Sequence, residues 1–254
     1  MKKNQSKKIL LVSPDSQGMD VITNFFAPCL GIVRIASYLN KYNHTAEFYD
    51  HNLYACSGKG LSLEEKILEK TWDYIGFSTL DDTLLQDIKN MYLAQKLCPE
   101  AIIIAGGIEA QFNYQTLLDK SPCRIVISGE GELPIRMIAD GEPWENIPGI
   151  VVKNMAEPMS IELFNEATST INWEDLPYED YWKVYKKLYD KKWNSDIERQ
   201  VNTVRIFARN RCPIGCKFCS STSQLPLATG KNVPVISGTE ENLIANWKFN
   251  TGMG

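Results

Sequence analysis

The sequence predicts an α/β protein: a flavodoxin-like, doubly wound parallel sheet, followed by a linker and the first βα unit of a second domain. Short runs of isoleucine, valine and leucine alternate along the first half with segments of helical periodicity. The runs are continuous rather than alternately polar and apolar, which is typical of strands buried on both faces. A further strand-like run then precedes a cluster of cysteines, which sets the last part of the chain apart.

The elements of the first half follow in regular order. The predicted strands are apolar runs bounded by turn residues, namely residues 8–13, 45–49, 74–78, 101–105 and 124–128. The predicted helices place apolar residues at helical spacing, namely residues 30–39, 61–70, 82–97, 111–119 and 133–139. Ser62 and Glu65 fit a capping box at the start of the second helix, and Pro99 follows the end of the third.

Small and polar residues follow the predicted strands at their carboxyl ends. In an open parallel sheet this edge is where ligands bind. The residues that we expect there are Pro14, Asp15, Ser78, Thr79, Gly106, Gly107, Gly129, Glu130 and Gly131. Glycine lets a ligand approach the backbone closely, although the same glycines also fit a role in tight turns alone. Neither a P-loop nor a Gly-x-Gly-x-x-Gly after the first strand is present, which disfavours a nucleotide held by its pyrophosphate.

Composition narrows the function classes. The chain has 254 residues, of which 44% are apolar and 23% charged, so wholesale disorder is excluded. Lys plus Arg number 27 against 31 Asp plus Glu, and this net charge of −4 argues against nucleic acid as a partner. No apolar run approaches the ~18 residues of a membrane span, and residues 9–12 are too few for a signal-peptide core. We therefore expect a cytoplasmic protein without a membrane partner.

Between the two domains the sequence predicts a small hairpin and a linker. Residues 147–153 and 159–163 are predicted to form a small hairpin. Residues 172–185 are aromatic and acidic and contain Pro177, which indicates a linker packed on the rest of the protein. A new strand is predicted over 204–208. Residues 233–236 lead into a helix over 240–247, with Thr239 at its start.

The cysteines fall into two groups. Because their number is odd, we expect no disulfide framework. The scattered ones are expected to be small buried hydrophobes, namely Cys29, Cys56, Cys98 and Cys123. The others, Cys212, Cys216 and Cys219, have the spacing Cys-x3-Cys-x2-Cys. Three thiolates on one loop suit a 4Fe-4S cluster whose fourth iron stays open. Structural zinc, which usually takes four ligands, a chance cluster of buried cysteines and a redox-sensing thiol group are the alternatives.

The cysteine segment resembles the signature of the radical S-adenosylmethionine (radical SAM) enzymes. The resemblance implies that Cys212, Cys216 and Cys219 bind the 4Fe-4S cluster and that methionine's amino and carboxylate groups chelate the open iron. It further implies that Phe218 lies beside the adenine of S-adenosylmethionine. A reduced cluster in this family cleaves the sulfonium to a 5′-deoxyadenosyl radical, which requires an electron donor such as flavodoxin or ferredoxin.

The upstream part is similar to the cobalamin-binding domain of one branch of that family. The matching segments are Pro28 to Gly31, the pair Gly106-Gly107 and the run Gly129-Glu130-Gly131-Glu132. The implied cobalamin contacts are Ser78, Thr79, Gly106, Gly107, Gly129, Glu130 and Gly131. The implied organisation is a cobalamin-binding domain over 1–145, a hairpin and linker over 146–200, and the start of a radical SAM domain over 201–254.

The chain departs from cobalamin domains that ligate cobalt with histidine. Gln17 occupies the place of that histidine, and Asp20 replaces a glycine of the same motif. His44 and His51 flank the second strand instead, and we expect both to be ordinary polar residues. Cobalamin is accordingly expected to bind without a histidine ligand, a state common in this branch.

The second domain is expected to be an incomplete barrel. A full (βα)8 barrel takes ~250 residues, and the sequence reaches only Gly254 after the strand at 204–208. The resemblance implies an enzyme that transfers a methyl group to an unactivated centre. The alternatives are a radical cyclase or rearrangement enzyme and a non-catalytic module that binds cobalamin or the cluster.

Overall fold

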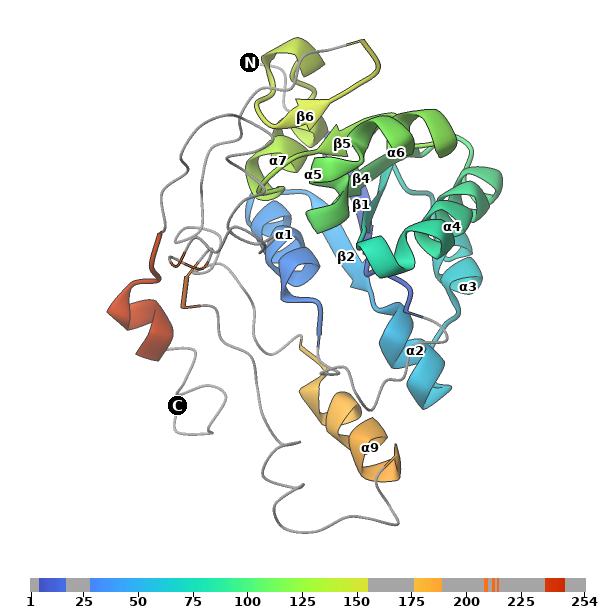
Figure 1. Ribbon diagram of the computed structural model, residues 1–254, viewed down its shortest axis with the longest axis vertical. Coiled ribbons are helices and arrows are strands. Elements are labelled where there is room, and N and C mark those ends of the chain that lie inside the picture. The colour runs from blue at the N-terminus through green and yellow to red at the C-terminus, as the bar shows by residue number, and fades with distance from the viewer. Residues whose placement is uncertain are drawn as a thin grey trace.

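A six-stranded sheet forms the centre of the protein in the computed structural model, which describes residues 5–16, 28–154, 176–188, 208–209, 212, 214 and 236–244. The strand order is β2-β1-β3-β4-β5-β6 (Figure 1). The strands are β1 (Lys8–Val12), β2 (Thr45–Tyr49), β3 (Tyr74–Ser78), β4 (Ile102–Gly106), β5 (Ile125–Ile127) and β6 (Ile150–Val151). The first five run parallel and β6 runs antiparallel to β5. This order confirms the predicted flavodoxin-like sheet.

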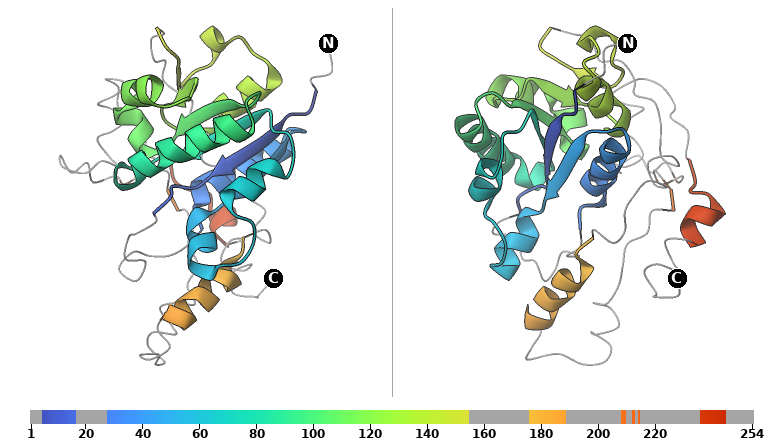
Figure 2. Two further views of the ribbon diagram at one scale, coloured as in Figure 1. Left: turned by 90° about the vertical axis from the view of Figure 1, so that its right-hand side faces the viewer. Right: turned by 180° about the vertical axis from the view of Figure 1, so that it is seen from behind.

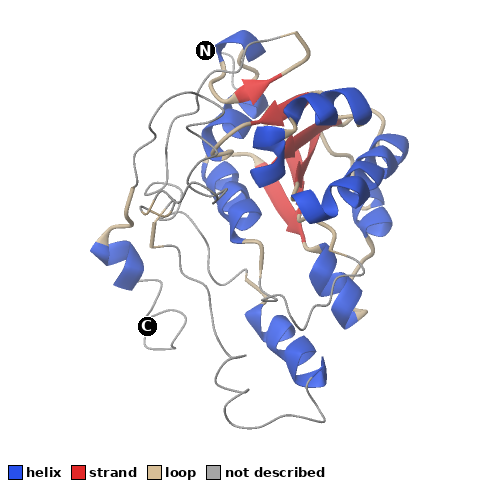
Figure 3. Ribbon diagram, in the orientation of Figure 1, coloured by secondary structure: helices blue, strands red, loops and turns tan. Residues whose placement is uncertain are grey.

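Helices cover both faces of this sheet (Figure 3). One face carries α1 (Leu30–Lys41) and α7 (Glu132–Asp140). The other carries α3 (Leu63–Leu68), α4 (Leu84–Leu97), α5 (Ile108–Phe112) and α6 (Tyr114–Lys120). The described residues also include α2 (His51–Ser57), α9 (Tyr178–Leu188) and the 3-10 turns η1 (Asp81–Thr83) and η2 (Trp144–Asn146). Every predicted strand of the first half therefore has its helical cover.

Successive residues of each strand enter different cores, because side chains alternate between the faces of a sheet. Leu10 and Val12 of β1 belong to the core under α3 and α4, whereas Ile9 and Leu11 belong to the core under α1 and α7. All four are at most 2% exposed. The continuous apolar runs thus reflect burial on both faces, as the sequence predicted.

Local signals explain which helices the sequence revealed. The capping box at α3 is present, with Ser62 N donating to Glu65 Oε2 at 2.8 Å and Glu65 N donating to Ser62 Oγ at 3.2 Å. Helix α2 was not predicted, because its short sequence carries no apolar periodicity. Asp50 caps it by accepting from two backbone N–H groups, and Gly58 ends it with φ +62°.

One predicted helix is divided in the structure. Residues 111–119 were expected to form a single helix, but Asn113 separates α5 from α6. Asn113 both ends α5 and precedes the first residue of α6, and its amide donates to the Glu109 carboxylate one turn earlier. Similarly, the helix predicted over 82–97 begins as the 3-10 turn η1 before α4 starts.

The segment expected to be a packed linker contains helix α9. Leu176 and Tyr178 pack on Leu30 and Val33 of α1, which confirms that this segment is packed on the sheet domain. The Tyr181 hydroxyl donates to the Asp50 carboxylate, so α9 lies against α2 (Figure 2). Of the predicted hairpin, β6 is observed beside β5, and residues 159–163 lie outside the described part.

The predicted βα unit is described in part. Arg209 forms an isolated antiparallel bridge with Ser237, and residues 240–244 are helical. Thr239 Oγ1 accepts from Asn242 N at 3.3 Å, which is the helix start that the sequence indicated. Residues 204–207 and 245–247 lie outside the described part.

Candidate functional site

A cavity of about 290 Å³ lies at the carboxyl ends of β3, β4 and β5, beneath α1 and α7. Its walls are apolar side chains from the sheet and the two helices, namely Leu11, Ile32, Ile35, Phe77, Ile104, Ile127 and Ile135. Its glycines are Gly31, Gly76, Gly106, Gly107, Gly129 and Gly131. A cavity of this size suits a small organic group.

Gly107 is required by its conformation and its surroundings. Its φ is +95°, and a Cβ at this position would lie 2.7 Å from both the N and the O of Thr79. The backbones of the two loops meet here, since Thr79 N donates to Gly106 O at 2.8 Å and Glu109 N donates to Thr79 O at 3.2 Å. The glycine pair after β4 therefore fixes the loop that follows β3 at the edge of the cavity.

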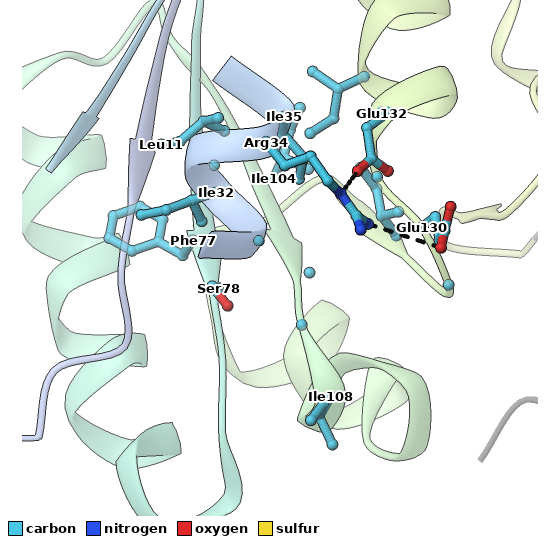
Figure 4. Close-up of a pocket in the computed structure, with 18 of the residues that line it drawn as sticks. Leu11, Ile32, Arg34, Ile35, Phe77, Ser78, Ile104, Ile108, Glu130 and Glu132 are labelled. Atoms are coloured by element: carbon cyan, nitrogen blue, oxygen red, sulfur yellow. Dashed lines mark hydrogen bonds and ion pairs between the residues drawn. The ribbon is translucent and has the colours of Figure 1, made fainter. Parts of the chain in front are cut away.

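An ion-pair group lines part of the cavity. Arg34 extends from α1 toward Glu130 and Glu132 (Figure 4). Its Nε donates to Glu132 Oε1, and its Nη2 lies 3.8 Å from Glu130 Oε1. The side chain of Glu132 is 1% exposed and that of Arg34 is 11% exposed. Removal from water makes this pairing necessary, because an unpaired buried charge is costly.

Two acceptors that line the cavity have no hydrogen-bond partner in the described structure. They are Glu132 Oε2 and Gln111 Oε1, and both atoms are buried. A buried acceptor without a partner costs free energy, so such groups call for an explanation. Both residues line the cavity.

The structure brings most of the predicted cobalamin contacts together. Ser78, Gly106, Gly107, Gly129, Glu130 and Gly131 all line the cavity. Thr79 is fully buried beside it, where its Oγ1 donates to Gly106 O at 3.0 Å. The role of these residues in binding stays a prediction. Sequence reasoning did not select Arg34, Gln111 or Glu132 as site residues. A charged residue between Val33 and Ile35 on the apolar helix was a usable signal for Arg34.

A buried polar network occupies the neighbouring edge, at the ends of β1 and β2. Asp87 Oδ1 accepts from Asp15 N at 2.9 Å, and Asp87 Oδ2 accepts from Thr83 Oγ1 at 2.6 Å. Asn90 Nδ2 donates to Asp15 Oδ2 at 2.9 Å and lies 3.3 Å from His51 Nε2. All five residues are at most 7% exposed. Asp15, expected at the ligand edge, therefore lies in this network.

Burial shifts the titration of this network. Desolvation raises the pKa of Asp87 to about 7, and it lowers the pKa of His51 from its usual 6.5 although Asp15 and Asp50 oppose that shift. His44 is also buried, with its Nε2 3.3 Å from Asp140 Oδ1. Both histidines are core polar residues with partners, as expected from the sequence.

The cysteine motif is described at one position. Cys212 is exposed, and Cys216, Phe218 and Cys219 lie outside the described residues, as does Gln17. Within the described residues, no group of three or more His, Cys, Asp or Glu side chains is placed to hold a metal ion. Cys98 and Cys123 are buried, as predicted, whereas Cys29 and Cys56 are half-buried.

Comparison with known sequences gives two curated relatives. No protein-family model matches the chain. The anaerobic magnesium-protoporphyrin IX monomethyl ester cyclase of Rubrivivax gelatinosus is 24% identical over 231 residues, which is 84% of this chain and 38% of the cyclase. A protein of the same name from Cereibacter sphaeroides is 23% identical over 164 residues, 62% of this chain and 26% of its own length. The chain thus spans well under half of each relative.

Solved structures share the fold. The radical S-adenosylmethionine methyltransferase TsrM from Kitasatospora setae, solved with cobalamin and a 4Fe-4S cluster, matches with a TM-score of 0.67 at 13% identity. The match covers 98% of this chain and 46% of that one. The cobalamin-dependent S-adenosylmethionine radical enzyme OxsB, with aqua-cobalamin and S-adenosylmethionine bound, matches with a TM-score of 0.57 at 16% identity, over 85% of this chain and 28% of its own. The chain therefore has a fold found in cobalamin-dependent radical SAM enzymes. No described helix is both long and apolar enough to cross a membrane.

Proposed function

We propose that this chain is the cobalamin-binding and cluster-binding part of a radical SAM enzyme. The observation that carries the proposal is the glycine-lined cavity at the carboxyl edge of the sheet, in a fold shared with proteins solved with cobalamin bound. The proposed cofactors are cobalamin, a 4Fe-4S cluster and S-adenosylmethionine. The proposed organisation keeps the boundaries 1–145, 146–200 and 201–254.

The cavity fits one part of cobalamin. The corrin macrocycle is too large for about 290 Å³, but the two-ring base on the nucleotide tail matches an apolar slot of this size. Gly106, Gly107, Gly129 and Gly131 present backbone without side chains at its edge, which lets the ligand approach closely. Ser78 and Glu130 add polar groups at the same edge. The macrocycle would then rest outside the strand ends.

The cluster is proposed to bind Cys212, Cys216 and Cys219, with Phe218 beside the adenine. The exposure of Cys212 is compatible with this role, because a cluster must be assembled on an accessible loop. When bound, the cluster and S-adenosylmethionine supply a 5′-deoxyadenosyl radical, and cobalamin supplies a transferable methyl group. An electron donor such as flavodoxin or ferredoxin is proposed as the protein partner.

The reaction is proposed to be methyl transfer to an unactivated centre, and one structural neighbour is named as a methyltransferase. Radical cyclisation is the second candidate, because both curated relatives are named as cyclases. Reduced, reconstituted protein that converts S-adenosylmethionine to 5′-deoxyadenosine is expected for either enzyme. Methylation of the added cobalamin favours the methyltransferase, and uptake of cofactors without any cleavage would leave a binding module.

The cobalamin site is tested by filling the cavity from Gly31. This helical position lines the cavity, and a Cβ added there meets no atom within 4 Å. Gly31→Leu is expected to abolish uptake of hydroxocobalamin, measured as cobalt per chain after gel filtration. The free energy of unfolding should rise by up to about 1 kcal/mol, because glycine is a poor helix former. Gly31→Ala is the matched control, which should be similarly stable and still bind. Normal cobalt uptake by Gly31→Leu would refute this location.

The cluster ligands are tested by anaerobic reconstitution with iron and sulfide. About four irons per chain are expected for the unmodified protein, with loss of the cluster in Cys216→Ala. Cys123→Ala is the control, because Cys123 is buried and its pKa is raised to about 11 by desolvation, so it is a poor thiolate donor. An unchanged iron count in Cys216→Ala would refute the assigned ligands.

A further inference from the structure

Two buried oxygen atoms that line the cavity have no hydrogen-bond partner within the described residues, and they bear on which type of corrinoid the site prefers. Glu132 is completely buried, yet only its Oε1 is bonded, to Arg34. Its Oε2 has no partner, although the residue lines the cavity at the first turn of α7. A buried carboxylate oxygen of this kind is satisfied by a hydrogen-bond donor of the ligand.

Gln111 supplies a second acceptor to the same cavity. Its Oε1 is buried and has no partner in the described structure. The walls around the two acceptors are aliphatic or aromatic, since Ile104, Ile127 and Phe77 face the same space. A ligand group that enters this slot therefore needs a flat apolar body and an N–H or O–H at its edge.

Cobalamin itself has a flat apolar base, but this base carries no N–H or O–H donor. Its base, 5,6-dimethylbenzimidazole, carries two methyl groups and one ring nitrogen that accepts hydrogen bonds. Related corrinoids carry adenine instead, whose exocyclic amine donates two hydrogen bonds.

We propose that Glu132 and Gln111 select the lower base of the corrinoid, favouring a base with an N–H donor over dimethylbenzimidazole. This proposal rests on the proposed function, because it concerns the group that enters the same cavity. Glu132 is then a specificity-determining residue, held in place by Arg34. Discrimination of this kind is strong where a buried polar group would be left unpaired by the wrong ligand.

The test compares two probes, hydroxocobalamin and its adenine-containing counterpart, by equilibrium dialysis against the full chain. The adenine form should bind at least about tenfold more tightly, the effect of one charge-assisted hydrogen bond. In Glu132→Gln the ratio should fall toward equal affinity, because the neutral amide can no longer accept a charge-assisted hydrogen bond from the adenine amine. Glu130 remains beside Arg34 in that variant, at 3.8 Å.

Further variants keep the result interpretable. Gln111→Met removes the second acceptor at nearly constant shape and touches no ion pair, so it should lower the ratio even if Glu132→Gln folds poorly. Tyr49→Phe is the matched control. The Tyr49 hydroxyl is also buried without a partner, but it lies in the core on the opposite face of the sheet. Its removal should leave the ratio unchanged.

Each outcome decides between the two proposals. Equal affinity of both probes for the unmodified protein overturns the base selection and leaves the cobalamin site standing. If both probes bind the unmodified protein equally and both bind Glu132→Gln more weakly, the donor that Glu132 accepts from is a ribose hydroxyl, which both probes carry. This result also overturns the base selection. Binding of neither probe removes the proposed function and this inference together.

Discussion

The side of the sheet edge near α2 and α4 differs from the side near α1 and α7 in how its buried polar groups are satisfied. Near α4, Asp15, Asp87 and Asn90 bond to one another in a closed network. Near α7, Glu132 Oε2 and Gln111 Oε1 face a cavity without partners. Buried polar groups that find partners within the protein stabilise it, whereas unpartnered acceptors that line a cavity are available to a ligand. The comparison supports the binding site that we propose on the α1 and α7 side.

Among the residues at the cavity, Gly107 is expected to have the largest effect on the free energy of unfolding. Gly107→Ala is expected to lower the free energy of unfolding by about 3 kcal/mol, because the new Cβ would lie 2.7 Å from backbone atoms of Thr79 at a positive φ. Gly58→Ala is the control, with φ +62° and open space around its Cβ, and should cost only about 1 kcal/mol. Urea denaturation of both variants measures the difference. Equal losses would show that φ alone, rather than contact with the neighbouring loop, requires glycine.

One pair of substitutions tests the comparison directly. Asn90→Ala leaves Asp15 Oδ2 and His51 Nε2 without a shared partner, and is expected to cost about 2 kcal/mol. Gln111→Ala on the cavity side should change the stability by less than about 0.5 kcal/mol, because its Oε1 has no protein partner to lose. Both are measured without ligand by urea denaturation. Similar costs would contradict the distinction between the two sides.

Helix α9 contacts the side of the sheet edge near α2 and α4 through Tyr181. Tyr181→Phe removes a hydrogen bond to the Asp50 carboxylate and should cost about 1.5 kcal/mol. Asp50 keeps its bonds from the backbone of α2, so α2 itself should persist. Tyr92→Phe is the control, since that hydroxyl bonds a carbonyl at an exposed site. Equal effects of the two variants would mean that α9 is held by apolar packing alone.

The smallest expected effect is the pH dependence of stability, which arises from the buried polar network near α2 and α4. The pKa of Asp87 is raised by burial to about 7, so the folded state holds a proton that the unfolded state releases near 3.8. Its contribution to stability is therefore present below about pH 4 and is lost as the pH rises to about 7, by no more than ~1.4 kcal/mol per pH unit. His51, with a lowered pKa, acts in the opposite direction and loses stability as the pH falls below 6.5.

Asp87→Asn separates the two contributions. The unmodified protein should lose stability relative to this variant as the pH rises from about 4 to about 7, because the variant has no carboxyl to ionise. Unfolding free energies at several pH values give the difference, and His51 is common to both proteins. A difference that stays constant with pH would show that Asp87 is ionised throughout that range.

Local sequence signals were sufficient where the physics is local. The five strand runs of the first half, the capping box at Ser62 and the helix start at Thr239 each depend on neighbours in the chain, and all are observed. Helix α2 and the break at Asn113 were missed. Helix α2 begins at the side chain of Asp50, which accepts from two backbone N–H groups, and α6 begins at Asn113 without a side-chain cap. Neither start leaves a periodic pattern in the sequence.

The sequence by itself determined the doubly wound sheet and named the glycine-rich strand ends, because burial on both faces demands continuous apolar runs and close approach demands glycine. Only the tertiary structure decided what those ends enclose. Arg34 and Glu132, which form an ion pair, are 98 residues apart in the chain. Asp15 and Asn90, which are hydrogen-bonded, are 75 residues apart. Partners so distant in sequence are chosen by the packing of helices on the sheet. Which polar groups are paired, and which are left facing a cavity, is therefore a property of the fold.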